Sequence, residues 1–472
     1  MYHYEWDSSS DDDDFRSDYS SASDFEPLRK DVNWEVDKDR FELLRRLHYR
    51  ITWEWKSYRI PNFRSAFRDE EMDRLLSDCV NHRKGKHDDD DWLSRFIGIV
   101  AGSGYKDQPK DDDENRTTPI HRAARSHTCS VWIVDHLFDI YDRYDVNYRD
   151  ETGLTHFHVA CKYGCQEMVE KFLEAGQDPN VVWRKTGDSP LHLAVENYQP
   201  RVISSLLSKD ADPNWANAEG STPLHSICQR DEEMKMFFDI CDELNRTVQV
   251  DVKDKKGLIP LQLAVANLDP NAVELLLDRG ADLSSFTFPT GINYFDGRYR
   301  SSKSRLGLAS SIVICVELLE KRGYELHRGD VLGILKLFSG YEMFLRSDYY
   351  NDDKNDDDED FENEAKAIAV NSRLSLYDLF RSAEQLLELK QVTHADCERL
   401  SRSDEYRAFW SRRVLHRSIQ LCDKISRKLV QDCALEPFWE LMGGRLPLEC
   451  CRAILGKLTN EDLYNICLAS EG

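Results

Sequence analysis

Four side chains that could bind a metal ion stand close together in the chain: His156, His158, Cys161 and Cys165, in the pattern H-x-H-x2-C-x3-C. Imidazole nitrogens and thiolate sulfurs are the ligands of closed, tetrahedral zinc sites. Such a site needs ligands that converge on one point, whereas the repeats described next give His158 and Cys161 structural places in a helix. We therefore expect no metal ion and no cofactor.

Enzymatic motifs are missing from the sequence as well. It contains no glycine-rich phosphate loop, no nucleophile elbow and no H-E-x-x-H zinc signature. We therefore expect a non-catalytic protein.

One short phrase recurs through the same part of the chain as TPIH, THFH, SPLH, TPLH and IPLQ. The five copies begin at residues 118, 155, 189, 222 and 259, so they lie 37, 34, 33 and 37 residues apart. The leading Thr or Ser can cap a helix, because its oxygen accepts a hydrogen bond from a free backbone N–H of the first turn. Proline at the next position loses no helical hydrogen bond. The aliphatic residue points into the stack, and the histidine can bridge neighbouring turns.

A second helix is expected after most copies, for example where Val169, Phe172 and Leu173 follow helical spacing. Turns rich in Gly, Asp and Asn close these units. The phrase and its period resemble the ankyrin repeat. The array covers 113–325 if an imperfect sixth unit at 291–325 is included, in which Glu320 gives the outer face of a terminal repeat a polar residue. The resemblance implies a mainly α ankyrin-repeat solenoid with short hairpin loops.

Ankyrin arrays bind proteins, and their variable residues lie on the hairpin tips and the inner helix face. Exposed Trp and Arg are favoured anchors of interfaces. The alternative for Trp183 and Trp215 is that they cover their own loops. The candidate residues for binding an unknown target protein are Trp183, Arg184, Trp215, Asn217, Lys253 and Lys255.

The flanking segments differ in composition from the array. We expect an acidic disordered tail at 1–36, a helical extension at 37–112, and a helix followed by an acidic disordered loop at 326–369. The formal net charge of −24 disfavours nucleic-acid binding. No run of 18 apolar residues supports a membrane span. The cysteines are scattered and no secretory signal is visible, so we expect the protein in the cytoplasm or the nucleus.

The C-terminal segment carries a second motif, L-P-x-E-x-x-x-x-I-L-x-x-L-x-x-x-D-L, beginning at Leu446. Proline and glutamate suit a first helical turn, and residues 459–462 resemble a capping box that starts another helix. With ankyrin repeats upstream, the segment 370–472 resembles the PRANC domain, a small helical F-box-like domain of poxviral, parasitoid-wasp and some endosymbiont ankyrin proteins.

This second resemblance implies docking on the Skp1 subunit of a cullin-1 ubiquitin ligase, with the repeats selecting the target. By motif position, the docking residues would be Leu446, Pro447, Leu448, Ile454, Leu455, Leu458 and Leu463. Two alternatives remain open. The segment can instead close the C-terminal helical bundle, and the protein can sequester or inhibit a signalling partner without ubiquitin transfer.

Overall fold

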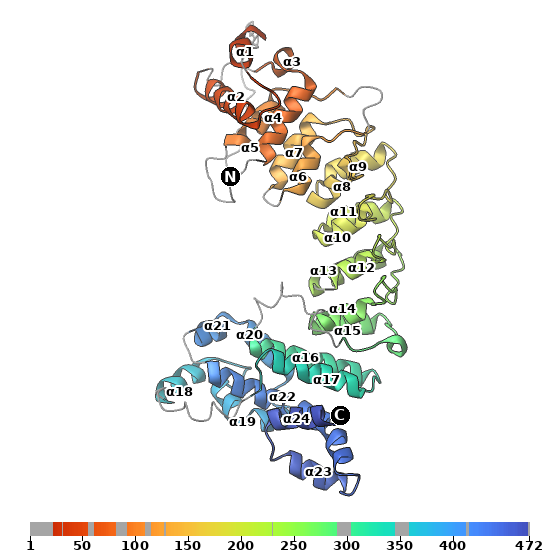
Figure 1. Ribbon diagram of the computed structural model, residues 1–472, viewed down its shortest axis with the longest axis vertical. Helices are drawn as coiled ribbons and strands as arrows, with labels where there is room; N and C mark the ends of the chain where they lie inside the picture. Colours follow the sequence, from red (N-terminus) through yellow and green to blue (C-terminus); the bar gives the residue numbers. More distant parts are fainter. Residues whose placement is uncertain are drawn as a thin grey trace. The chain divides into compact units, whose positions relative to one another are not determined.

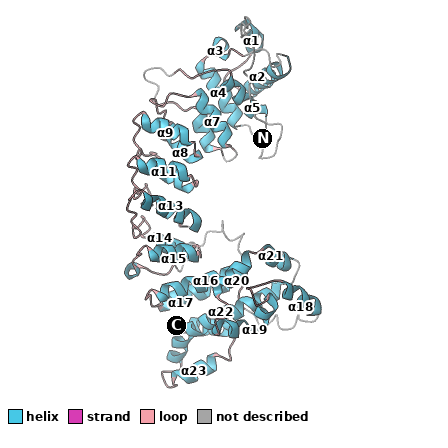
Figure 2. Cartoon of the chain, turned by 180° about the vertical axis from the view of Figure 1, so that it is seen from behind, coloured by secondary structure: helices cyan, strands magenta, loops and turns pink. Residues whose placement is uncertain are grey.

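The computed structural model of the chain consists of helices joined by loops (Figures 1 and 2). It describes residues 22–30, 32–54, 61–81, 92–108, 115–126, 129–228, 230–289, 304–344, 358–411 and 415–470. No β-strand is present in these segments, so the predicted mainly α fold is confirmed. None of the helices described is long and apolar enough to cross a membrane. Two compact units divide the chain: Met1–Glu219 with Ile240–Arg246, and Gly220–Asp239 with Thr247–Gly472.

The first unit begins with a group of helices that precede the recurrent phrase. They are α1 (Ala22–Arg29), α2 (Asp37–Tyr49), the π-helix η1 (Arg50–Glu54), α3 (Phe63–Ala66), α4 (Asp69–Asn81) and α5 (Trp92–Gly102). Phe25 of α1 is fully buried, and its ring lies 5.8 Å from that of Phe63 and 5.7 Å from that of Phe67. The predicted tail at 1–36 therefore needs a correction, because these aromatic contacts fold α1 onto α3.

Helices α4 and α5 continue into the repeats. In the first unit the repeat helices are α6 (Pro119–Arg125), α7 (Val131–Ile140), α8 (His156–Tyr163), α9 (Gln166–Glu174), α10 (Pro190–Glu196) and α11 (Pro200–Ser208). Helix α4 packs on α6 and α5 on α7, in the same way as α8 packs on α10 and α9 on α11. The pair α4–α5 therefore occupies the place of a further repeat, inside the segment 37–112 that was expected to be an extension.

A buried ion-pair network joins this pair to the next repeat. The guanidinium of Arg116 lies 2.5 Å from a carboxylate oxygen of Asp73 in α4 and 2.9 Å from one of Asp107. Tyr141 and Tyr148 donate their hydroxyl protons to Asp73 and Asp107. Burial raises the pKa of Asp73 to about 6, against the opposing effect of Arg116.

The second unit contains α12 (Pro223–Ile227), α14 (Pro260–Ala266), α15 (Pro270–Asp278) and η3 (Leu283–Ser285). Helix α13 (Asp231–Glu243) belongs to this unit as far as Asp239 and to the first unit from Ile240. Next come the 17-residue α16 (Arg305–Lys321) and α17 (Arg328–Gly340). Helix α16 packs on α15, but α20 (His394–Arg402) and α22 (Leu415–Leu441) also pack on it. The C-terminal helices therefore cover the outer face of the expected sixth unit, and α16 belongs to both. The side chain of Glu320 is nevertheless exposed.

The remaining helices of this unit surround α22. They are α18 (Asp358–Ala367), α19 (Leu376–Glu388), α21 (Asp404–Ser411), α23 (Leu448–Leu455) and α24 (Asn460–Ala469). The acidic run at 351–364 was expected to be a disordered loop, but α18 begins inside it and buries Phe361. Residues 351–357 lie outside the described part of the chain.

Candidate protein-binding surfaces

The recurrent phrase caps the first helix of a repeat reciprocally where it starts with Thr or Ser. In the second copy, Thr155 precedes α8 and its Oγ1 accepts a hydrogen bond from the backbone N–H of His158 at 3.3 Å. The backbone N–H of Thr155 in turn donates to Nδ1 of His158, also at 3.3 Å. The same backbone-to-imidazole bond occurs at His121, His192 and His225. The imidazole therefore satisfies a backbone donor that the helix itself leaves free.

The other ring nitrogen ties the helix to a hairpin loop. Nε2 of His121 lies 3.2 Å from the carbonyl oxygen of Tyr148. The same distance is 3.1 Å from His158 to Val181 and 3.3 Å from His225 to Leu258. Since Nδ1 accepts, Nε2 carries the proton and donates it to the carbonyl. The predicted bridging role of the histidine is confirmed. In the last copy a side-chain amide makes the equivalent hydrogen bonds.

That amide belongs to Gln262. Its Oε1 accepts from the backbone N–H of Ile259 at 3.0 Å, and its Nε2 donates to the carbonyl oxygen of Thr287 at 3.0 Å. The replacement of His by Gln therefore preserves both hydrogen bonds. Ile259 has no hydroxyl, however, so the fifth copy lacks the acceptor that Oγ1 of Thr155 offers to the N–H of His158.

Burial sets the charge of the capping histidines. It lowers the pKa of His121 and of His158 to about 4 and lowers that of His225 as well. A proton on Nδ1 would also face the backbone N–H that now donates to it. The neutral form is therefore the one that fits the repeat.

The four side chains that suggested zinc have separate structural tasks. Nε2 of His156 lies 2.7 Å from Oγ1 of Thr118, while Nδ1 of His158 serves the cap described above. Cys161 and Cys165 are buried, and burial raises the pKa of both thiols. No group of three metal-binding side chains occurs in the segments that the structure describes.

The hairpin loops of the first unit hold the tryptophans predicted to bind a target. Nε1 of Trp183 donates to Oγ1 of Thr152 at 3.0 Å, and Nε1 of Trp215 donates to the carbonyl oxygen of Gly187 at 3.3 Å. Both indoles are half-buried. Asn217 donates to Oδ1 of Asp188 at 2.8 Å. These three side chains connect one hairpin to the preceding one.

The basic candidates on the loops are exposed. Arg184 lies over Gly153, where an added Cβ would approach the Arg184 side chain to 2.7 Å, and its surface faces solvent. In the second unit Lys253 and Lys255 are exposed on a loop of the same kind. The basic candidates are therefore exposed, whereas the aromatic candidates connect the loops to one another.

At the C-terminus, one arginine fixes the last two helices on α22. Nη1 of Arg427 donates to Oδ1 of Asn460 at 2.8 Å, and Nη2 donates to the carbonyl oxygens of Leu455, Gly456 and Leu458. These carbonyls lie at the end of α23 and in the turn that follows it, and that of Leu455 also accepts from the backbone N–H of Leu458 at 3.2 Å. Arg427 therefore orients α23 and α24 together.

The seven predicted docking residues differ in how far they are buried. Leu455 and Leu463 are buried, at 1% and 0% exposure, on the side of α23 and α24 that packs on α22. Leu446 and Leu458 are half-buried. The exposed members of the set are Pro447, Leu448 and Ile454. Two of the seven predicted residues thus pack into the fold, and three are open to solvent.

Three more apolar side chains nearby, those of Trp439, Leu441 and Met442, are exposed and were not predicted. Five of the twelve large apolar residues that are exposed among those described fall within 439–454, and each is 39–50% exposed. They are Trp439, Leu441, Met442, Leu448 and Ile454. We call them the 439–454 surface. Nε1 of Trp439 donates to the carbonyl oxygen of Leu446 at 3.1 Å, which ties the end of α22 to the start of α23. A concentration of exposed apolar residues is typical of a protein-binding site.

Comparison with known proteins identifies the repeats. A family model described as "Ankyrin repeats (3 copies)" matches residues 93–182 and 191–287. The match begins in α5, in agreement with the packing of α4–α5 as a further repeat. The expectation that the array starts at 113 is therefore too late.

Several curated relatives match the same region. "B-cell lymphoma 3 protein homolog" of Mus musculus is 38% identical over 140 residues, which are 29% of this chain and 30% of that protein. "Neurogenic locus notch homolog protein 4" of Homo sapiens is 35% identical over 121 residues, 25% of this chain and 6% of that protein. A "Putative ankyrin repeat protein" of Fowlpox virus is 26% identical over 185 residues, 38% of this chain and 53% of that protein. The chain spans about half or less of each relative. Its central part, over 93–287, consists of ankyrin repeats.

Proposed function

We propose that the chain is an adaptor in which the ankyrin repeats bind a target protein and the C-terminal helices bind Skp1 of a cullin-1 ubiquitin ligase. The repeats indicate binding to protein partners. The observation that carries the second half of the proposal is the 439–454 surface, which coincides with the L-P-x-E motif that resembles an F-box. Apolar side chains held outside the core on a fixed helix are suited to bury against a partner.

The exposed residues decide which variant tests docking. Replacing Leu455 or Leu463 would place a charge in the core and unfold the C-terminal helices, whereas Leu448 and Ile454 are 47% and 39% exposed. We therefore propose Leu448→Asp with Ile454→Asp, and measure the recovery of purified Skp1 on the immobilised full chain. Loss of two apolar contacts of about 1.5 kcal/mol each corresponds to a decrease of more than tenfold.

A matched control replaces exposed apolar residues elsewhere. Leu389 and Val131 are 58% and 45% exposed and lie outside the C-terminal motif. The variant Leu389→Asp with Val131→Asp should recover Skp1 as well as the wild type. If the wild type recovers no Skp1, or if the Leu448/Ile454 variant recovers as much as the wild type, the ligase part of the proposal is wrong.

The second candidate function is sequestration of a signalling partner without ubiquitin transfer. It is favoured by the burial of Leu455 and Leu463, which leaves a smaller docking surface than the motif implies. The Leu448/Ile454 variant separates the two functions better than a truncation, because removal of α23 and α24 would expose α22. Sequestration predicts that the abundance of the bound target in cells is the same with the variant and with the wild type. Ubiquitin transfer predicts that it rises with the variant.

Target binding is assigned to the exposed cations of the loops. Trp183 and Trp215 make hydrogen bonds from one hairpin to the preceding one. Arg184, Lys253 and Lys255 take no part in these bonds and are exposed. Their replacement by Glu should reduce binding of a target identified by crosslinking, with an unchanged melting temperature. Trp183→Ala should lower the melting temperature instead. If the three Glu variants bind the target as the wild type does, these residues are not the contact.

A further inference from the structure

Helix α1 packs against α3 and α2 at the start of the first unit (Figures 1 and 2). Two of its side chains, Phe25 and Arg29, hold it there, and because they lie four residues apart they share one face of the helix. Phe25 is fully buried, whereas Glu26 and Pro27 between them are exposed. Helix α1 therefore presents to the fold an aromatic ring followed, one turn later, by a guanidinium group.

The ring of Phe25 lies in an aromatic site formed by Phe63 and Phe67. Its centroid is 5.8 Å from that of Phe63 and 5.7 Å from that of Phe67. Phe63 also meets Phe96 of α5 edge to face at 5.8 Å, and Phe67 meets Trp34 in the same way at 6.4 Å. Both walls of the site therefore have contacts with the rest of the fold that do not involve α1.

The guanidinium group of Arg29 is held at the end of α3 and in the first turn of α4. Nη2 lies 2.9 Å and 2.8 Å from the two carboxylate oxygens of Glu71, and Nη1 donates to the carbonyl oxygen of Ala66. The group also lies over the ring of Phe67, 5.2 Å from its centroid. A carboxylate, a carbonyl and an aromatic face together suit the planar group of arginine better than the ammonium of lysine. The site is thus built for arginine beside an aromatic ring.

Helix α1 has little stability of its own. It is eight residues long and contains Pro27, which cannot donate a helical hydrogen bond. Isolated helices of this length are not stable in water. The chain that follows is anchored separately, because the carbonyl oxygen of Trp34 accepts from Arg40 at 2.7 Å and from Arg74 at 2.8 Å. Helix α1 can therefore leave its site while Trp34 and the helices after it keep their places.

We propose that this site is a docking site for a partner protein, and that α1 fills it as an internal ligand. We call it the α1 site; it consists of Phe63, Phe67, Glu71 and the carbonyl of Ala66. The partner segment is a helix that carries phenylalanine and, four residues later, arginine, because α1 shows that this pair fills both halves of the site. A tethered ligand acts at an effective concentration in the millimolar range, so the partner binds in competition with α1.

The test measures binding of a fluorescent peptide with the sequence of residues 20–32 to the full chain. Phe25→Ala with Arg29→Ala removes both side chains that hold α1 and frees the α1 site. We expect the dissociation constant, measured by anisotropy, to be at least tenfold lower for this variant than for the wild type, in which α1 competes. Circular dichroism confirms that the variant is folded.

Changes in the peptide and in the site locate the binding. A peptide with Arg29→Lys should bind the freed chain about tenfold more weakly, since lysine keeps the charge but cannot reach Glu71 and Ala66 together. Glu71→Gln, added to the freed chain, should weaken the wild-type peptide about tenfold as well. Glu174→Gln makes the same change in charge on an exposed residue of α9 and should have little effect.

A second measurement uses the wild-type chain and does not depend on the folding of a variant. The amides of α1 should exchange with deuterium about a hundredfold faster than those of α4, because α1 opens locally whereas α4 opens with the helices packed on it. Hydrogen exchange followed by mass spectrometry compares the two helices in one sample.

Four outcomes would overturn the proposal. The freed chain could bind the peptide no more tightly than the wild type, which would mean that α1 does not block a docking site. The Glu71→Gln chain could bind as well as its Glu174→Gln control, which would place the peptide elsewhere. Exchange in α1 as slow as in α4 would make α1 a fixed part of the fold. A wild-type dimer in light scattering that Phe25→Ala with Arg29→Ala abolishes would place α1 of a second copy in the site instead.

Discussion

Arg427 and Asn460 hold the last two helices of the chain together, with 2.8 Å between Nη1 of Arg427 and Oδ1 of Asn460. Asn460 is fully buried, and its Nδ2 also donates to the carbonyl oxygen of Asp423 in α22 at 2.9 Å. Because Arg427 also binds the carbonyls that end α23, this contact sets the orientation of the 439–454 surface. A polar pair in the interior thereby positions apolar residues on the exterior.

The first prediction concerns this pair. Asn460→Ala removes one acceptor of the half-buried Arg427 guanidinium and the donor to the carbonyl oxygen of Asp423, so we expect a loss of about 1–3 kcal/mol in the free energy of unfolding. Asn465→Ala, in the same helix but exposed, should change it by less than about 0.5 kcal/mol. The free energy of unfolding of both variants is measured by chemical denaturation, with the fluorescence of Trp439 as the signal in a chain that retains this tryptophan alone. Equal stability of the two variants would argue against this role of Asn460.

The second prediction concerns the capping histidines. His158→Gln should be tolerated, because Gln262 makes the equivalent pair of bonds in the last copy. His158→Ala removes the acceptor for Thr155 and the donor for Val181 and should cost about 1–3 kcal/mol. Thermal unfolding of the two variants side by side gives the answer. If Gln is as harmful as Ala, the bridge is not what the histidine contributes.

The third prediction is a loss of stability in mild acid. The pKa of His121 and of His158 falls from about 6.5 in the unfolded chain to about 4 in the fold. The stability that their neutral form provides is present above pH 6.5 and is lost as the pH falls towards 4. Between pH 7 and pH 5 each should contribute a loss of about 2 kcal/mol. Asp73 acts in the opposite direction, because its pKa is raised to about 6 and protonation there favours the folded state.

Melting temperatures at pH 7, 6 and 5 test this dependence. The variant with His121→Gln and His158→Gln should lose much less stability over this range than the wild type, since glutamine does not titrate. A wild-type melting temperature that does not change between pH 7 and pH 5 would contradict the prediction.

The fourth prediction separates backbone strain from steric clash at two glycines. Gly187 has φ +76°, and a Cβ there would lie 2.3 Å from the backbone nitrogen of Ala218 in the next hairpin. Gly176 has φ +86° with nothing within 4 Å of its Cβ position. Gly176→Ala should therefore cost only the left-handed conformation, about 1–2 kcal/mol, and Gly187→Ala clearly more. Similar melting temperatures for the two variants would show that the hairpins move apart without cost.

The repeats could be predicted because their signal is local and periodic. A cap such as Thr155 with His158 involves residues three positions apart, so its spacing appears directly in the sequence. The pair α4–α5 escaped prediction because α4 begins without the recurrent phrase, with Asp69, Glu70 and Glu71 in its first turn instead. Its place in the stack depends on packing against α6 and α7, and on the Arg116 network, which joins residues far apart in the chain.

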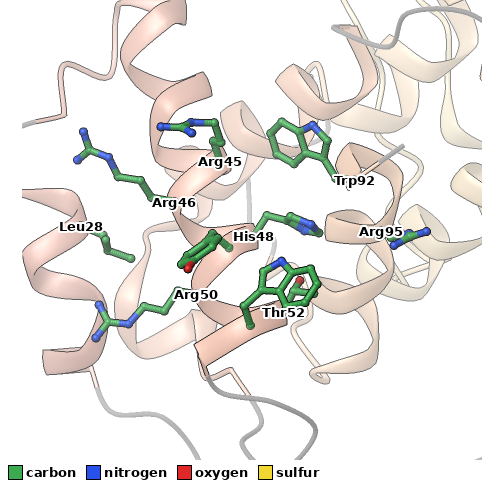
Figure 3. A pocket seen from close by; sticks show the side chains of 10 residues that line it. Leu28, Arg45, Arg46, His48, Arg50, Thr52, Trp92 and Arg95 are labelled. Atoms are coloured by element: carbon green, nitrogen blue, oxygen red, sulfur yellow. The ribbon is translucent and has the colours of Figure 1, made fainter. Parts of the chain in front are cut away.

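The candidate sites were predicted only in part, for a related reason. Motif position placed Leu455 and Leu463 among the docking residues, but a motif does not indicate whether a side chain packs on α22 or on a partner. Trp439 and Met442 gave no local signal, because exposure of an apolar residue is decided by what the rest of the fold leaves uncovered. Arg46 and Arg95 line one pocket (Figure 3) but come from separate helices, and only the tertiary structure brings them together.

The packing at each end of the repeats has a practical consequence for where the chain can be cut. Helices α4 and α5 cover α6 and α7 within the first unit, and α20 and α22 cover α16 within the second. A fragment limited to 113–325 would uncover the buried side of α6 at one end and that of α16 at the other. Expression of the array alone should therefore give an aggregating product, and fragments meant for crystallisation or for partner screens should begin before α1 and retain α22.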